Sequence, residues 1–193
     1  MAIRKSSMDI RKMTYLAILT AIVFVLQYIS LFMRFSAFSL TFVLVPIVVG
    51  VAACGMWSGA WLGFVFAMAV FATGDANLFL GFDVLGTIVV VVFKGVLSGL
   101  ACGIVYKLLE KKNQFLAIIM AAIIAPIVNT GIFFLGCILF FFDDIAFTFE
   151  LEASQVIPFV IFGFIGINFI IEFAINLILA PTIFRIIKIN KKN

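Results

Sequence analysis

The sequence contains no histidine and only 3 cysteines, and these absences exclude several classes of protein. The three cysteines, Cys54, Cys102 and Cys137, lie far apart in or beside apolar segments. This spacing, without any histidine, argues against a zinc site and against a disulfide framework. The sequence also lacks an HExxH motif, a GxSxG motif and a Walker-type glycine loop. We therefore expect no enzymatic activity, no cofactor and no bound metal.

Charged residues are scarce as well, and most of the chain is apolar. Of its 193 residues, 66% are hydrophobic and 11% are charged, whereas soluble domains average about 45–50% apolar and about 25% charged residues. A fold of this length cannot hide so much apolar surface from water. The apolar runs are continuous rather than alternating, which favours helices over a β-barrel. The sequence thus predicts an all-α integral membrane protein.

Six apolar runs predict six membrane-spanning helices within a single domain over residues 1–193. A spanning helix needs about 20 apolar residues, and short polar or charged segments separate the runs. The predicted helices cover residues 13–31, 37–53, 56–72, 84–106, 115–141 and 158–184. The stretch CGMWSG predicts a tight turn, residues 73–83 a polar loop, and residues 142–157 an acidic loop. Pro158 suits the first turn of the last helix.

The charges predict how this bundle sits in the membrane. Eleven of the 13 lysines and arginines fall on one side of a six-helix bundle: Arg4, Lys5, Arg11, Lys12, Lys107, Lys111, Lys112, Arg185, Lys188, Lys191 and Lys192. The other side holds Asp75, Asp83, Asp143, Asp144, Glu150 and Glu152, with Arg34 as its cation. Positive charge stays in the cytoplasm, so both termini are expected there. The basic segments suit anionic lipid better than nucleic acid.

A layer of polar residues is predicted near the middle of the membrane. Lys94 lies about ten residues into its predicted helix, which is about 15 Å deep in a hydrocarbon core about 30 Å thick. A lysine at that depth costs about 2.5–3.5 kcal/mol and must face the protein interior. Glu172 lies at a similar depth in the last helix. The other polar residues of this layer are Asn129, Thr130, Asn168 and Asn176.

Two interpretations of this layer stay open at this stage. In the first, it is the floor of a ligand cavity that opens outward, with loop residues above it. The candidate substrate-binding residues are then Arg34, Asn77, Asp83, Lys94, Asn129, Asn168 and Glu172. In the second, Lys94 and Glu172 form a structural ion pair, and the asparagines join helices. The same pair also leaves open a solitary proton-coupled transporter, and a membrane scaffold is the alternative without transport.

Small residues spaced four apart mark surfaces where helices can approach closely. They occur at Gly59 and Gly63, at Gly95, Gly99 and Gly103, and at Ala121 and Ala125. The glycines that share a helix with Lys94 are expected to pack inside the bundle. Ala17 and Ala21 differ, because they lie near the cytoplasmic end of the first helix, away from the polar layer. Their spacing forms a ridge about one helical turn long, which suits a partner helix.

The length, the six-helix topology and the Ala-x-x-x-Ala pattern of Ala17 and Ala21 resemble the S components of energy-coupling factor (ECF) transporters. This resemblance implies a multi-pass protein of the prokaryotic cell membrane that captures a vitamin from outside. Its covering loops would be residues 33–36, 73–83 and 142–157. It would dock through the two alanines on a transmembrane coupling subunit (EcfT) that carries two ATPase subunits (EcfA and EcfA'). Those partners would hydrolyse ATP, while the S component topples in the bilayer.

The polar residues also suggest a substrate. Arg34 and Lys94 favour a carboxylate, and the asparagines favour hydroxyl or amide groups. Pantothenate fits these groups best among the vitamins, while folate, lipoate and a pyrimidine-like or pyridoxine-like vitamin stay open.

Overall fold

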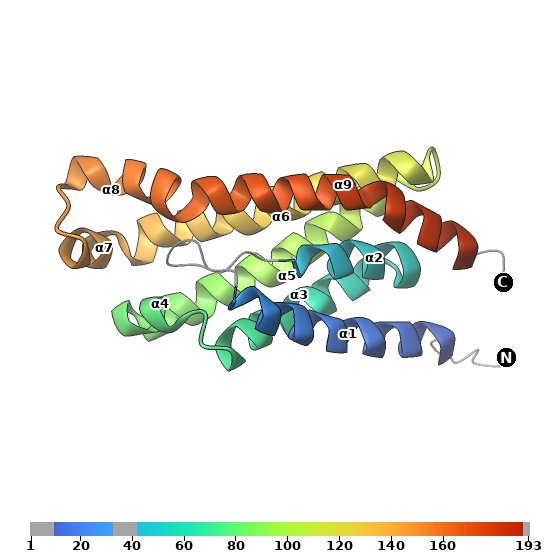
Figure 1. Cartoon of the computed structure of the whole chain (residues 1–193), viewed down its shortest axis with the longest axis horizontal. Coiled ribbons are helices and arrows are strands. Elements are labelled where there is room, and N and C mark those ends of the chain that lie inside the picture. The colour runs from blue at the N-terminus through green and yellow to red at the C-terminus, as the bar shows by residue number, and fades with distance from the viewer. Residues whose placement is uncertain (1–9, 33–41, 191–193) are drawn as a thin grey trace, which may run out of the picture.

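The computed structural model in Figure 1 is an elongated bundle of helices, and it describes residues 10–32 and 42–190. Over these residues the chain forms helices and no strand. The elements are α1 (Ile10–Ser30), α2 (Leu44–Cys54), α3 (Met56–Ala72), α4 (Asn77–Phe82), α5 (Val84–Leu109), α6 (Gln114–Phe140), α7 (Phe142–Thr148), α8 (Ala153–Phe159), the π-helix η1 (Val160–Gly166) and α9 (Ile167–Asn190).

Four helical stretches are long and apolar enough to cross a membrane: Ile10–Ser30, Val84–Leu109, Gln114–Phe140 and Ala153–Ile189. The other two predicted spans correspond to α2, with 11 residues, and α3, with 17 residues. Both are shorter than the roughly 20 residues that a straight crossing needs. The helix predicted over 37–53 begins only at Leu44 among the described residues, and residues 37–41 lie outside them. The all-helical fold is confirmed, whereas the count of six spans stays a prediction.

Two predicted loops contain helices, so those loop assignments are wrong in part. The segment 73–83 includes α4, because its apolar stretch NLFLGF folds back and buries Phe79, which is 3% exposed. The segment 142–157 includes α7 and the start of α8. Pro158 does not begin the last helix but lies inside α8. Its ring cannot accommodate regular α-helical bonding to the preceding turn, and the chain continues directly as the π-helix η1.

Charges of opposite sign gather at opposite ends of the bundle. Figure 1 places the start of α1, the connection between α5 and α6, and the end of α9 at one end, with α4, α7 and α8 at the other. The described basic residues of the first end are Arg11, Lys12, Lys107, Lys111, Lys112, Arg185 and Lys188. The acidic residues Asp143, Asp144, Glu150 and Glu152 lie in and beside α7 and α8. Which end faces the cytoplasm stays a prediction.

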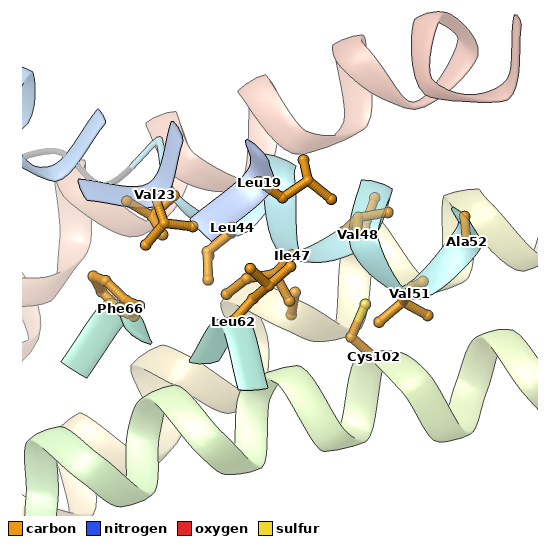
Figure 2. Close-up of a cluster of buried hydrophobic side chains, with 14 of the residues drawn as sticks. Leu19, Val23, Leu44, Ile47, Val48, Val51, Ala52, Leu62, Phe66 and Cys102 are labelled. Atoms are coloured by element: carbon orange, nitrogen blue, oxygen red, sulfur yellow. The ribbon is translucent and has the colours of Figure 1, made fainter. Parts of the chain in front are cut away.

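The main apolar core lies where α1, α2 and α3 pack against α5. Figure 2 shows Leu19 and Val23 of α1 in one cluster with Ile47 of α2 and Leu62 of α3, and Cys102 of α5 beside Val51 of α2. Val23, Ile47, Leu62 and Cys102 are fully buried. One stripe of α1 is therefore covered by the bundle, and the rest of that helix faces outward.

The contact between α3 and α5 is made by glycines. A Cβ added at Gly59 would overlap the carbonyl oxygen of Gly99, and a Cβ added at Gly63 would overlap that of Gly95. The reverse additions, at Gly95 and Gly99, would overlap the carbonyl oxygens of Gly63 and Gly59. The two backbones thus touch directly, as small residues permit in membrane proteins. The prediction of internal packing for the glycines of α5 is confirmed.

Candidate functional site

A polar cavity lies between α5, α6, η1 and α9, beside the turn that connects α3 to α4. Ten residues line it: Asp75, Lys94, Asn129, Thr130, Phe133, Phe164, Ile165, Asn168, Phe169 and Glu172. Four of the seven residues predicted from the sequence as substrate-binding are in this set. The structure therefore brings Lys94, Asn129, Asn168 and Glu172 together around one space, although they come from three separate helices.

The cation of this cavity, Lys94, interacts with several groups of the protein. The acidic residues that line the cavity with it are Asp75 and Glu172. The ammonium nitrogen also lies 5.2 Å from the centre of the Phe133 ring and 5.7 Å from that of Phe66. Aromatic faces attract cations at such distances. Lys94 thus shares the cavity with two acidic residues, Asp75 and Glu172, and lies over two aromatic rings.

Asp75 and Gln27 are functional candidates that were not among the binding residues predicted from the sequence, although Asp75 was expected in a loop above the cavity floor. Asp75 follows the turn at Gly74, whose φ of 72° is in the left-handed region that favours glycine. The Nε2 of Gln27 in α1 donates a hydrogen bond of 3.2 Å to Oδ2 of Asp75, and Gln27 is fully buried. The signal in the sequence was an amide within the apolar run 13–31. This bond joins α1 to the lining of the cavity.

Of the three remaining predicted site residues, the two that the structure describes, Asn77 and Asp83, do not line the cavity. Asp83 caps the N-terminus of α5, because its carboxylate accepts hydrogen bonds from the backbone of Leu85 (3.1 Å) and of Gly86 (2.9 Å). Asn77 is exposed at the start of α4. Arg34 lies outside the described residues.

Aromatic side chains form one wall of the site. Phe79 of α4 packs against Phe133 of α6 and Phe164 of η1, with ring centres 5.6 and 6.1 Å apart. The π-helix brings Phe164 and Ile165 to the cavity, and the Phe164 carbonyl accepts a hydrogen bond of 3.4 Å from the Asn168 amide. Single π-helical turns inside α-helices are frequent at functional sites. This turn therefore shapes the side of the cavity formed by the last helix.

The polar cavity is small in this conformation and adjoins a larger apolar groove. Its volume is about 40 Å³, enough for a few water molecules, whereas small-molecule pockets usually measure about 300–1,000 Å³. The groove between α6, η1 and α9 has a volume of about 330 Å³. Thr130, Ile165 and Phe169 line both spaces. Movement of these shared side chains would join the two spaces into one.

Asn176 belongs to the same polar stripe of α9 but stands apart from the cavity. It is fully buried, and its side-chain amide donates a hydrogen bond of 2.8 Å to the backbone carbonyl of Glu172. It is not among the lining residues. Its hydrogen bond is to the backbone of its own helix and does not involve the Glu172 carboxylate.

Ala17 and Ala21 are both exposed on the outer side of α1. The covered stripe of that helix contains Leu19, Val23 and Gln27. Thr20 lies beside the alanines, and its hydroxyl accepts a hydrogen bond of 3.1 Å from the Trp61 indole of α3. The small-residue ridge is thus available to another helix in the isolated chain.

Comparison with known families gives one match. The sequence matches the family described as "ECF transporter, substrate-specific component" over residues 11–184. No curated protein and no solved structure matches the chain significantly. The matched region includes all the helices that form the cavity and the alanines of α1. Subunits of this family are membrane proteins that bind a small molecule, are not enzymes, and associate with EcfT and EcfA subunits, where the ATPase activity lies. The chain belongs to the family of substrate-specific components of ECF transporters.

Proposed function

We propose that this chain captures a water-soluble vitamin from outside the cell and delivers it inward through an ATP-driven coupling module. The observation that supports this most strongly is the cavity itself. In a chain of this family, five ionisable or amide side chains from three helices and the α3–α4 turn surround one space: Asp75, Lys94, Asn129, Asn168 and Glu172. Burying so many polar groups in a membrane bundle costs free energy. Binding of a polar ligand would explain why these groups are present there.

The proposed arrangement in the membrane follows the charge distribution. The basic end of the bundle faces the cytoplasm of a prokaryotic cell, with both termini on that side. The acidic end, with α4, α7 and α8, then faces outward. All six apolar helices cross or enter the bilayer as one domain, and α2 and α3 are held there by their buried contacts. Substrate would enter the cavity from the side of α4, α7 and α8.

The proposed docking surface for EcfT is the ridge formed by Ala17 and Ala21. Replacing either alanine with tryptophan should abolish uptake by the assembled transporter, because the large ring separates the two helices. Substrate binding by the isolated chain should be unchanged, since the ridge is exposed and distant from the cavity. Loss of binding in these variants would show instead that the alanines are needed inside the bundle.

The experiment that tests the proposed function is a binding screen of the purified full chain against water-soluble vitamins. Pantothenate is the first candidate from sequence, followed by folate, lipoate and pyrimidine-like or pyridoxine-like vitamins. Binding would raise the thermal unfolding temperature, and at equal ligand concentration a tighter ligand gives the larger rise. Binding of one vitamin, with transport only in the presence of EcfT and the ATPase subunits, is the expected result.

The same reconstitution distinguishes the two other functions considered. Proton-driven uptake by liposomes that contain this chain alone would support a solitary transporter that uses Lys94 and Glu172. Failure to bind any small molecule would support a scaffold role. Either result would contradict the proposed function.

A further inference from the structure

The charges that line the cavity do not favour an anionic substrate. Its ionisable lining residues are Lys94, Asp75 and Glu172, and Asp75 and Glu172 are 9% and 6% exposed. With all three ionised, the two carboxylates and one ammonium give the described lining a net charge of −1. The prediction of a carboxylate ligand considered Lys94 together with Arg34 and did not include Asp75. The charge balance of the described lining is therefore opposite to the one that suggested pantothenate.

The positive charge of Lys94 is already compensated by the protein. Its ammonium shares the cavity with both carboxylates and lies over the rings of Phe66 and Phe133. A substrate carboxylate would compete with these groups for the ammonium. It would also enter a small space that already holds two carboxylates, where like charges repel strongly because little water screens them. Lys94 thus already has acidic and aromatic neighbours within the protein, and it is poorly suited to attract an additional anion.

An amide of the same cavity offers an acceptor to the substrate. Asn129 is 6% exposed, and its Oδ1 is buried without a hydrogen-bond partner among the described residues. A buried acceptor without a donor costs free energy, and a substrate N–H group would remove that cost. The side chain of Asn129 lines the cavity, and no donor among the described residues forms a hydrogen bond with this oxygen. The unpaired atom therefore favours a ligand that donates.

The walls of the cavity favour the same kind of ligand. Phe133, Phe164 and Phe169 line it, and the negative faces of aromatic rings attract organic cations. We propose that the substrate presents a protonated amine or a cationic ring nitrogen to Asp75, Glu172 and Asn129. This inference rests on the proposed function and names the substrate class of that site. Carboxylate-bearing vitamins are rejected by the same groups.

The test compares ligands that share a skeleton and differ in charge. The probes are pyridoxamine, pyridoxine and 4-pyridoxate, together with panthenol and pantothenate, and thiamine as a permanent cation. Dissociation constants are measured by calorimetry on the purified full chain. Among probes that share a chemical skeleton and bind, the probe with the more positive charge should bind about tenfold more tightly than the next. This difference corresponds to about 1.4 kcal/mol of binding free energy. Tighter binding of a carboxylate than of its neutral counterpart, or equal binding of both, would overturn the inference.

Variants of the two acids sharpen the test. Glu172→Gln should reduce the preference for the cationic probe about tenfold, and Asp75→Asn provides a second variant if the first fails to fold. Asp143→Asn is the matched control, because it removes the same charge from exposed α7, outside the cavity. An equal loss of preference in the control would also overturn the inference. An anionic vitamin that binds tightly would leave the proposed function intact, whereas the absence of binding by every vitamin would contradict both.

Discussion

Helix α5 takes part in two contacts of opposite character, and Lys94 and Gly95 stand next to each other at the boundary between them. On one side Gly95 and Gly99 place the backbone of α5 directly against α3. On the other side Lys94 lines a polar cavity with side chains of α6 and α9. The first contact has no side chains that could rearrange. The second is built from long or polar side chains around a small space.

The difference between these two contacts suggests that the α3–α5 contact holds the site in place, whereas the cavity side of α5 can adapt to a ligand. Backbone-to-backbone contact leaves no space for side-chain motion, so it fixes the position of α5 relative to α3. The residue that carries the cavity's cation is attached to that fixed backbone. The opposite wall contains a π-helix and side chains shared with an apolar groove. We expect the structural changes that accompany substrate binding to occur on the side of η1.

The largest expected effect is at the glycine contact. Gly99→Ala adds a methyl group where the carbonyl oxygen of Gly59 lies. Overpacking costs about 1–3 kcal/mol and occasionally more, and an overlap with backbone falls at the upper end of that range. We expect loss of monodisperse protein in size-exclusion chromatography. Gly131→Ala is the control, because an added Cβ there meets nothing within 4 Å. A stable, monodisperse Gly99→Ala protein would show that the two helices are not locked together.

The next effect concerns the two asparagines of α9. Asn168→Leu should preserve folding but weaken substrate binding by about tenfold or more, because an amide that lines the cavity is lost. Asn176→Leu should leave binding nearly unchanged, since Asn176 is outside the cavity and bonds within its own helix. Calorimetric titration with the vitamin found in the screen gives both values. Equal losses in the two variants would mean that the whole polar stripe acts as one structural unit.

A moderate effect is expected where α1 joins the cavity. Gln27→Leu removes the hydrogen bond to Asp75, and a lost bond to a charged group costs about 1.5–3 kcal/mol. Thermal stability should fall, and substrate binding should weaken because the Asp75 carboxylate is held less firmly. Gln114→Leu serves as the control, since that amide contacts Tyr106 outside the cavity. Binding that is unaffected in the Gln27 variant would remove α1 from the site.

The smallest effect tests the assignment of Asp83. Asp83→Ala removes the N-cap of α5, and loss of such a cap costs about 1 kcal/mol. The unfolding temperature should drop by a few degrees, about 2–4 °C for a domain of this size. Substrate affinity should stay the same, because Asp83 is not among the cavity residues. A clear loss of affinity without a change in stability would restore Asp83 to the binding site, as the sequence predicted.

Much of the candidate site could be predicted because depth along a helix follows from counting residues. Lys94, Asn129 and Glu172 stand near the middle of long apolar runs, and the rise per residue is constant, so their common level required no knowledge of the fold. The membrane class followed in the same way from composition. The glycines of α5 were predicted to pack internally because they share a helix with Lys94 and because small residues let helices approach closely.

Other features depended on which elements meet in space. Asp75 is in a connecting turn and Gln27 is in a helix that seemed to face lipid, and only the packing of α1 against α3 makes them partners. The choice of Asp83 as a cap rather than a ligand depends on backbone geometry at one helix end. By itself the sequence determined an apolar chain with a buried polar layer, because hydropathy is additive along the chain. The tertiary structure decided the balance of charge in the cavity, because that balance depends on distances between residues far apart in sequence.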